Sequence, residues 1–267
     1  NETDPDLLFV YLKLLPITDK TFPPFHVLMI FLGPLLGIAL GFDAVNAEKN
    51  NGTLTLLLAQ PVYRDNLLLA KFTGALIVIS VLFFSLGLLM MGGGLIITGV
   101  PIEPVEFLRI MGFIVMTILY VGFWLSLSIC LSVVFKHAAT SALTAIGIWL
   151  FFAFFYSFVV NIIASALLPD KGFMEPDAVI SYNNFLLNLL RIAPGQLYND
   201  ATTILLRPSI RSLGPLTMEQ IAGAIPSPLP LKESIMIVWP QISGLVAAIT
   251  VCFALTYGLF MRKEIRT

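Results

Sequence analysis

Long apolar stretches alternate with shorter polar segments along most of the chain. A helix needs about 20 mainly apolar residues to cross the hydrocarbon core of a bilayer. Five stretches fit this requirement, and we expect each to span a membrane: residues 27–42, 72–98, 110–135, 138–168 and 235–261. The first is the shortest and contains Pro34. The pattern predicts an all-α, polytopic membrane protein in which residues 1–267 form a single transmembrane domain.

The polar connections differ in length and character. Residues 43–71 form a charged segment, Lys136-His137 a tight turn, and residues 169–234 a long connection with eight prolines. Within the long connection, apolar spacing predicts amphipathic helices at 179–192 and 194–206. We expect this connection to form an extracytoplasmic helical cap. It would either rest on the bilayer or serve as an outer gate or a dock for an extracytoplasmic partner.

Basic residues indicate the orientation of the chain, because short cytoplasmic loops carry an excess of Lys and Arg. With the C-terminal tail inside, alternation of the five spans places segment 43–71 and Lys136 inside as well. One side then holds these basic residues: Lys49, Arg64, Lys71, Lys136, Arg262, Lys263 and Arg266. Residues 1–26 would lie outside. Since the sequence then starts outside at Asn1, we expect a first helix to precede it, making six in the parent chain.

Composition supports a membrane class and excludes others. Hydrophobic residues make up 58% and charged residues 12%, against about 45–50% and about 25% in soluble chains. The mean hydropathy is +0.93. A net charge of −1 provides no basic surface for nucleic acid, and two cysteines cannot build a disulfide framework. We expect contact with a lipid bilayer and none with nucleic acid.

Segment 43–71 has the pattern of two helices separated by a turn. Gly52 is suited to end the first helix, and Thr53 to cap a second one. Leu54, Leu57 and Leu58 would form one apolar stripe, and Pro61 would end the second helix. Such a short amphipathic helix either lies flat on lipid headgroups or docks onto a cytoplasmic partner.

The run Glu48-x-x-x-Gly52-Thr53-Leu54-x-x-Leu57-Leu58-x-x-Pro61-Val62-x-Arg64 resembles a signature of type-2 ABC transporter permeases. It is most similar to the subgroup that includes the permease of the nitrous-oxide-reductase copper-maturation transporter. Residues 191–202, 211–215 and 239–266 also resemble that subgroup. The resemblance extends from about residue 28 to the end of the chain.

The resemblance implies a function and a set of partners. In this family the segment is a coupling helix that fits a groove of a cytoplasmic ATPase. The implied coupling residues are Glu48, Gly52, Thr53, Leu54, Leu57, Leu58, Pro61 and Arg64. The chain would be a plasma-membrane permease, paired with a second copy of itself as a homodimer. The sequence has no G-x-x-x-x-G-K-[ST] phosphate loop, so the partner ATPase would bind ATP and Mg²⁺, and this chain would carry no cofactor and no catalytic residue.

Polar residues within the apolar stretches are few. Asp43, Lys71 and Arg109 lie at the ends of the spans, which disfavours ion-coupled transport because such transporters place charges at bilayer depth. Most serines and threonines are expected to bond to helix carbonyls or to allow close packing. Asn161 is the strongest candidate for a polar group on a translocation path.

The sequence also bears on three other kinds of function. Cys130, Cys252 and several methionines contain soft ligands for Cu(I), but without C-x-x-C or clustered methionine spacing we expect no metal site. Besides an ATP-driven permease, the chain fits a non-transporting ABC membrane subunit that regulates or matures an extracytoplasmic protein. A membrane-embedded enzyme fits less well, since no catalytic polar cluster stands out.

Overall fold

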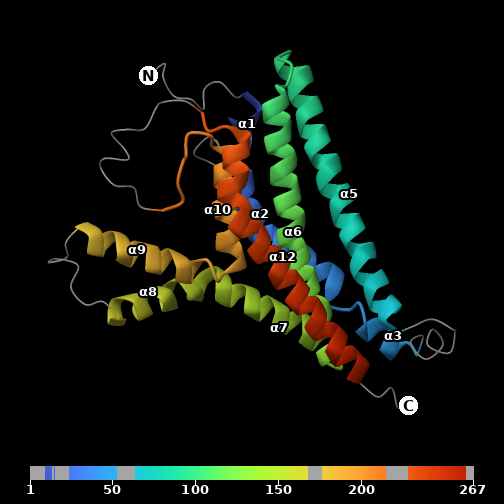
Figure 1. The fold of residues 1–267 in the computed structure, drawn as a ribbon. Coiled ribbons are helices and arrows are strands. Elements are labelled where there is room, and N and C mark those ends of the chain that lie inside the picture. Colours follow the sequence, from blue (N-terminus) through green and yellow to red (C-terminus); the bar gives the residue numbers. More distant parts are fainter. Residues whose placement is uncertain are drawn as a thin grey trace.

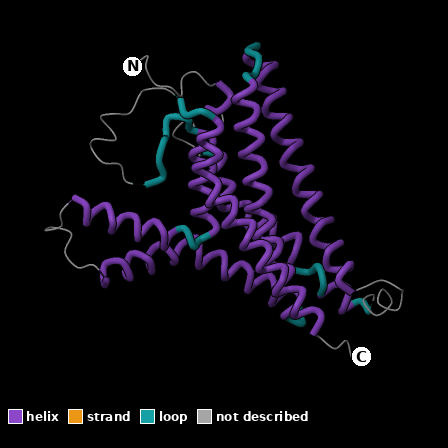
Figure 2. Tube along the Cα trace, in the orientation of Figure 1, coloured by secondary structure: helices purple, strands orange, loops and turns teal. Residues whose placement is uncertain are grey.

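The computed structural model describes residues 10–13, 15, 24–52, 64–167, 176–214 and 228–262. Within these ranges all regular secondary structure is helical (Figures 1 and 2). The helices are α1 (Val10–Lys13), α2 (Phe25–Gly41), α3 (Asn46–Asn50), α5 (Arg64–Thr98), α6 (Pro104–Val134), α7 (Ala138–Leu150), the π-helical turn η2 (Phe151–Phe155), α8 (Tyr156–Leu167), α9 (Pro176–Leu190), α10 (Pro194–Leu206) and α12 (Leu231–Arg262).

Five helical stretches of the described chain are long and apolar enough to cross a membrane. They are Phe25–Asn50, Asn66–Thr98, Pro104–Val134, Ala138–Ala166 and Leu231–Arg262. The predicted all-α, polytopic fold with five membrane helices is therefore confirmed. Several helices begin before their apolar stretch does. In α6 the extra turn starts at Pro104, where Glu103 and Glu106 form a capping box that satisfies the first backbone N–H groups.

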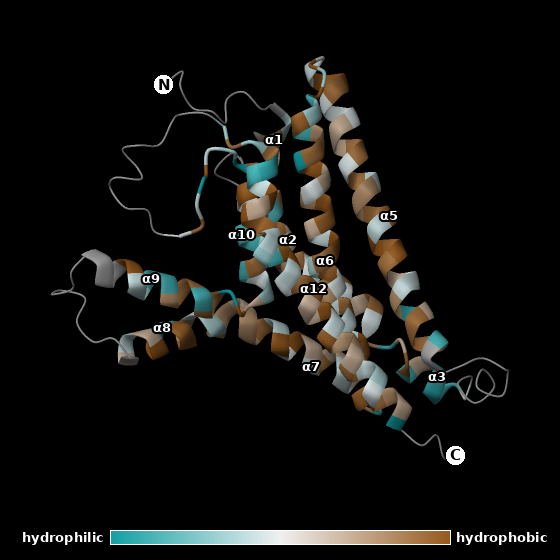
Figure 3. Ribbon diagram, in the orientation of Figure 1, coloured by the Kyte–Doolittle hydropathy of each residue, from teal (hydrophilic) through white to brown (hydrophobic). Residues whose placement is uncertain are grey.

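Helix α6 lies at the centre of the bundle and packs against α2, α5, α7, α10 and α12 (Figure 1). It is buried along most of its length, whereas most residues of each of the other four spans are not buried. Hydrophobic residues predominate along α5 and α6, and hydrophilic residues gather at α3 and on α9 (Figure 3). Outward-facing apolar surface of this kind is stable only against lipid or another apolar partner.

Three glycines set the close approach of α2 to α6. Gly33, Gly37 and Gly41 recur every four residues and are buried against α6. A Cβ atom on Gly37 would lie 2.6 Å from the Val121 carbonyl oxygen and 2.9 Å from the Leu125 nitrogen. Both obstacles are backbone atoms, which cannot move aside as a side chain does. This is the small-residue packing typical of helix pairs in membranes.

The chain between α7 and α12 has two parts with different surroundings. Helices α7, η2 and α8 follow one another as one bent rod, and α9 packs against α8 at the side of the bundle (Figure 1). Helix α10 then enters the bundle and packs against α6, α12 and α2. The two amphipathic helices predicted within 169–234 thus correspond to α9 and α10, and α10 is part of the core.

Candidate functional site: the two ends of α6

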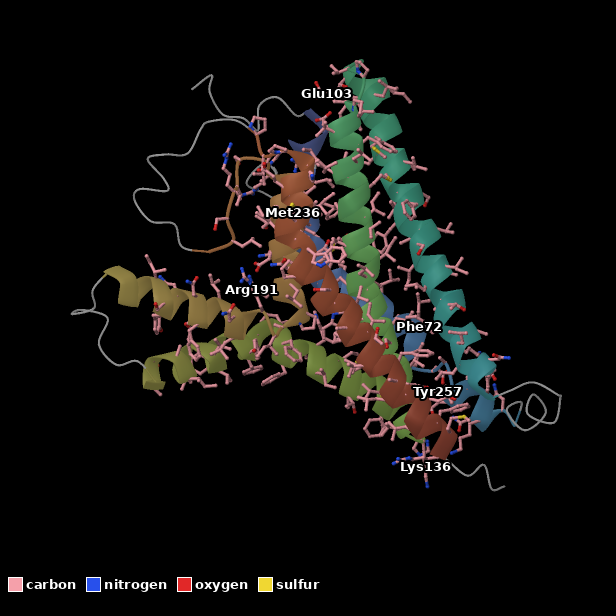
Figure 4. All side chains as sticks on the ribbon, viewed as in Figure 1. Phe72, Glu103, Lys136, Arg191, Met236 and Tyr257 are labelled. Carbon is pink, nitrogen blue, oxygen red and sulfur yellow. The ribbon has the colours of Figure 1, made fainter. Side chains whose placement is uncertain are left out.

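Buried polar groups fasten neighbouring elements to both ends of α6. Glu103 and Lys136 mark these ends in Figure 4, and we call them the Glu103 end and the Lys136 end. The segment predicted to couple to an ATPase begins at the Lys136 end. The connections around α10 lie toward the Glu103 end.

At the Lys136 end, the turn after α2 is fastened to the last turn of α6. The backbone N–H groups of Val45 and Asn46 donate to Ser132 Oγ, at 3.1 and 3.2 Å. Asn46 is 1% exposed. In the amide orientation that satisfies both of its atoms, its side-chain nitrogen donates to the carbonyls of Ser132 and Phe135 at 3.1 and 2.9 Å. Carbonyls at a helix C-terminus have no partner within the helix, so Asn46 caps α6 from a separate element.

An ion pair joins the two flanks of the candidate coupling segment. Glu48 Oε1 on α3 lies 2.5 Å from Lys71 Nζ on α5. The Lys71 side chain is 36% exposed, and such solvated pairs contribute about 0–1 kcal/mol to stability. The pair therefore positions the flanks more than it stabilises the fold. Glu48, predicted to meet the ATPase, contacts its own chain here.

Of the other predicted coupling residues, the structure describes Gly52 and Arg64. Gly52 occupies an exposed turn with φ +71°, a left-handed conformation that favours glycine. Arg64 is the first residue of α5. The remaining ones lie outside the described residues: Thr53, Leu54, Leu57, Leu58 and Pro61. Their roles stay predictions.

Toward the Glu103 end, Arg109 holds α10 and the start of α12 to α6. Its side chain is fully buried, and its guanidinium donates to the carbonyls of Leu205 at 3.2 Å, of Ile204 and of Leu229. Two of these carbonyls belong to the last turn of α10, the negative end of the helix dipole. The sequence alone predicts for Arg109 only a position at the edge of a span. An arginine one turn into an apolar helix was the available signal.

The corner between α9 and α10 is fixed by a second ion pair, which is half-buried. Asp200 is 6% exposed and accepts from Arg191 Nε at 3.0 Å and from Gln196 Nε2 at 2.7 Å. Two residues earlier, Tyr198 stacks on Tyr120 of α6 with ring centroids 4.6 Å apart. Burial raises the pKa of the Tyr198 phenol, so it stays neutral and hydrogen-bonds Thr117 at 3.0 Å.

Several weakly polar residues have the structural roles expected of them. Ser128 Oγ donates to the Ile38 carbonyl of α2, and Ser126 Oγ to the Ile249 carbonyl of α12. The amide of Asn161 donates to the Ser157 carbonyl of its own helix at 2.7 Å. The Asn161 side chain is exposed on α8, and its place on a translocation path stays a prediction.

The described part of the chain holds no group of three or more His, Cys, Asp and Glu side chains able to bind a metal ion. Cys130 and Cys252 are free thiols, each half-buried. Among the described residues, hydrogen bonds and an ion pair at the two ends of α6 join one helix to another, an arrangement suited to transmitting movement.

Comparison with known proteins agrees with this architecture. The sequence model of the ABC-2 family transporter proteins matches residues 2–265. A probable ABC transporter permease protein, NosY, of Pseudomonas aeruginosa is 28% identical over 243 residues, covering 89% of this chain and 78% of that protein. The probable NosY permease of Stutzerimonas stutzeri is 25% identical over 237 residues, covering 88% and 78%. With its apolar helices, the chain is thus a multi-pass membrane subunit of an ABC transporter, and it belongs to the ABC-2 transporter family.

Proposed function

We propose that this chain is the permease of an ATP-driven transporter and that a separate cytoplasmic ATPase docks on segment 43–71. That ATPase would bind ATP and Mg²⁺, and this chain would convert its movement into passage of a substrate across the plasma membrane. The observation that carries the proposal is the attachment of Asn46 to Ser132 and Phe135. A force applied to the segment would reach the central helix directly through this cap.

Helix α6 is suited to carry such a force along its length. Its 31 residues correspond to about 46 Å of helix. Pro34 lies inside α2, Pro240 lies inside α12, and the π-helical turn η2 lies between α7 and α8. The interior of α6 holds neither feature, because its proline is at its first turn. Movement at Ser132 would therefore reach Arg109, and through it the end of α10 and the start of α12.

The proposed permease would be a dimer with a defined orientation in the membrane. Large hydrophobic side chains remain exposed on α5, α7 and α12. Lipid and a second copy of the chain would cover them. Closed two-fold dimers are the commonest assembly of identical subunits. The Lys136 end would face the cytoplasm, where two ATPase subunits would bind one permease dimer.

The docking step can be tested by purification of the complex. Leu57→Asp places a charge in the predicted apolar stripe, so the variant should lose co-purification with the ATPase. Leu57→Ile, which keeps the apolar surface, should retain it. Association unchanged by Leu57→Asp would refute the coupling assignment.

The alternative is a membrane subunit that uses the same ATPase to regulate or mature an extracytoplasmic protein. It predicts the same docking result, so a second measurement is needed. Reconstitution in vesicles separates the two functions. ATP hydrolysis that alters a bound extracytoplasmic protein without net movement of a solute would support the alternative over transport.

A further inference from the structure

A cavity of about 280 Å³ lies where the α7–η2 rod passes between α2, α6 and the start of α10. Its wall is largely aromatic. The rings come from α6 (Tyr120, Trp124), from α7 and η2 (Trp149, Phe152) and from the first residue of α8 (Tyr156). Ligand pockets usually enclose about 300–1,000 Å³, so this cavity suits a small molecule.

Among the described residues, no charged side chain lines the cavity. The ionisable groups of the adjacent corner, Arg191 and Asp200, pair with each other. Polar lining is restricted to hydroxyl and amide groups, namely those of Ser157, Gln196 and Asn199 together with the tyrosines. A charged ligand would lose its hydration without gaining a counter-charge, so the lining selects a neutral one.

The cavity wall also holds a buried donor. Trp124 is 1% exposed. Its indole N–H lies beside the Tyr120 hydroxyl, which itself donates to the Ile30 carbonyl at 3.0 Å. The contact between the two side chains falls short of regular hydrogen-bond geometry, and a carbonyl or ether oxygen on a ligand would give this buried donor a better aligned acceptor.

The local backbone is unusual at the same place. η2 is a π-helical turn, a rare conformation that occurs frequently at functional sites. Two of its residues, Phe152 and Ala153, line the cavity, while Phe151, Phe154 and Phe155 are exposed on the outer surface of the rod. At this turn Phe152 therefore lines the cavity, whereas Phe151, Phe154 and Phe155 are exposed.

We propose that this cavity binds a neutral, flat aromatic molecule that carries a hydrogen-bond acceptor. The aromatic wall would pack against the flat body, and the Trp124 indole would donate to the acceptor. If such a molecule is also the transported substrate, that role rests on the proposed transport function. Its binding to the cavity does not depend on that function, because every lining residue belongs to this chain.

The probe for this site is 6-propionyl-2-dimethylaminonaphthalene, a neutral fluorophore with a ketone oxygen. The full chain, purified in detergent and carrying Trp239→Phe, keeps tryptophan only at Trp124 and Trp149, both in the cavity wall. Titration should give saturable energy transfer from these tryptophans to the probe. The anionic fluorophore 1-anilinonaphthalene-8-sulfonate should show at least 10-fold weaker saturable binding. Equal binding of the two dyes would overturn the requirement for neutrality.

Two variants locate the bound probe. Ala153→Phe fills the cavity and should weaken binding at least 10-fold, whereas Ala139→Phe adds the same ring at an exposed position of α7 and should leave binding unchanged. Helical content and elution volume show whether each variant is folded. If the folded Ala153→Phe variant binds the probe as tightly as the chain without this substitution, the probe does not bind in this cavity.

Trp124→Phe keeps an aromatic ring but removes the indole N–H. The emission of the bound probe should shift to shorter wavelength, because its ketone loses a hydrogen bond. An unchanged emission maximum would contradict the role of Trp124. These measurements use the permease without its ATPase, so failure of binding refutes the cavity, while failure of ATPase docking refutes the proposed function.

Discussion

At the residue scale, the smallest side chains decide how the two most closely packed helices meet. Gly37 of α2 places its Cα against the backbone of Val121 and Leu125 on α6. The absence of a side chain lets the two backbones come into contact. In a membrane such van der Waals packing, and not the hydrophobic effect, drives the association of helices. Gly74 of α5 and Gly147 of α7 have open space where a Cβ would stand. The same residue type therefore serves packing at one position and not at the others.

We predict that Gly37→Ala destabilises the permease by about 1–3 kcal/mol, the usual cost of overpacking. The added methyl group meets backbone atoms and must push α2 away from α6. Thermal unfolding in detergent measures the effect. Gly74→Ala is the matched control and should unfold at the temperature of the parent chain or slightly above it. Equal unfolding temperatures for Gly37→Ala and Gly74→Ala would show that this contact is looser than described.

At the element scale, α6 is important because separate segments terminate on it. α3 caps its Lys136 end through Asn46, and Arg109 binds the end of α10 near its other end. The Glu48–Lys71 pair adds α5 to the first of these junctions. The two elements that flank segment 53–63 in the sequence, α3 and α5, are therefore tied to each other and to the bundle.

We predict that Glu48 acts on coupling through Lys71. Glu48→Lys places two positive charges together and should reduce ATP hydrolysis by the assembled complex. The exchange Glu48→Lys with Lys71→Glu rebuilds the pair and should restore much of that activity. Stability of the isolated permease should change by less than about 1 kcal/mol, as for other solvated pairs. If the exchange fails to restore activity while the ATPase still binds, Glu48 contacts the ATPase directly.

At the scale of the whole molecule, burial is distributed unevenly. One central helix is enclosed, and the surrounding spans present apolar side chains outward. The proposed orientation aligns the long axis of α6 with the membrane normal. Residues near α3 and residues after α10 would then lie on opposite sides of the bilayer.

We predict that cysteines at Asn51 and Ser209 are labelled from opposite sides. Both positions are exposed in the structure. Each single cysteine is introduced into a chain whose Cys130 and Cys252 are replaced by Ala. A membrane-impermeant maleimide applied to intact cells should label the Ser209 variant, and the Asn51 variant only after the membrane is opened. Labelling of both variants in intact cells would reject the proposed orientation.

Local sequence patterns were enough for some features of this protein and not for others. The apolar stretches predicted five spans, and proline at the first turn marks the start of α10. The four-residue spacing of Gly33, Gly37 and Gly41 was visible in the sequence, yet the spacing alone does not name the helix that α2 contacts. From the sequence, Asn46 lies in the helix expected before Gly52, and Arg109 lies at the end of a span. Their hydrogen-bond acceptors are about 90 or more positions away in the chain, so the local pattern does not reveal them.

The sequence by itself determined the membrane class, the number of spans, the polar segment between the first two and the family signature. These follow from hydropathy and motif order, which are properties of neighbouring residues. Only the tertiary structure decided that α6 is central, that α10 enters the bundle, and that rings from α6, α7 and η2 enclose a cavity. These depend on which distant helices pack together, and that choice rests on shape and hydrogen-bond matching between segments far apart in the chain.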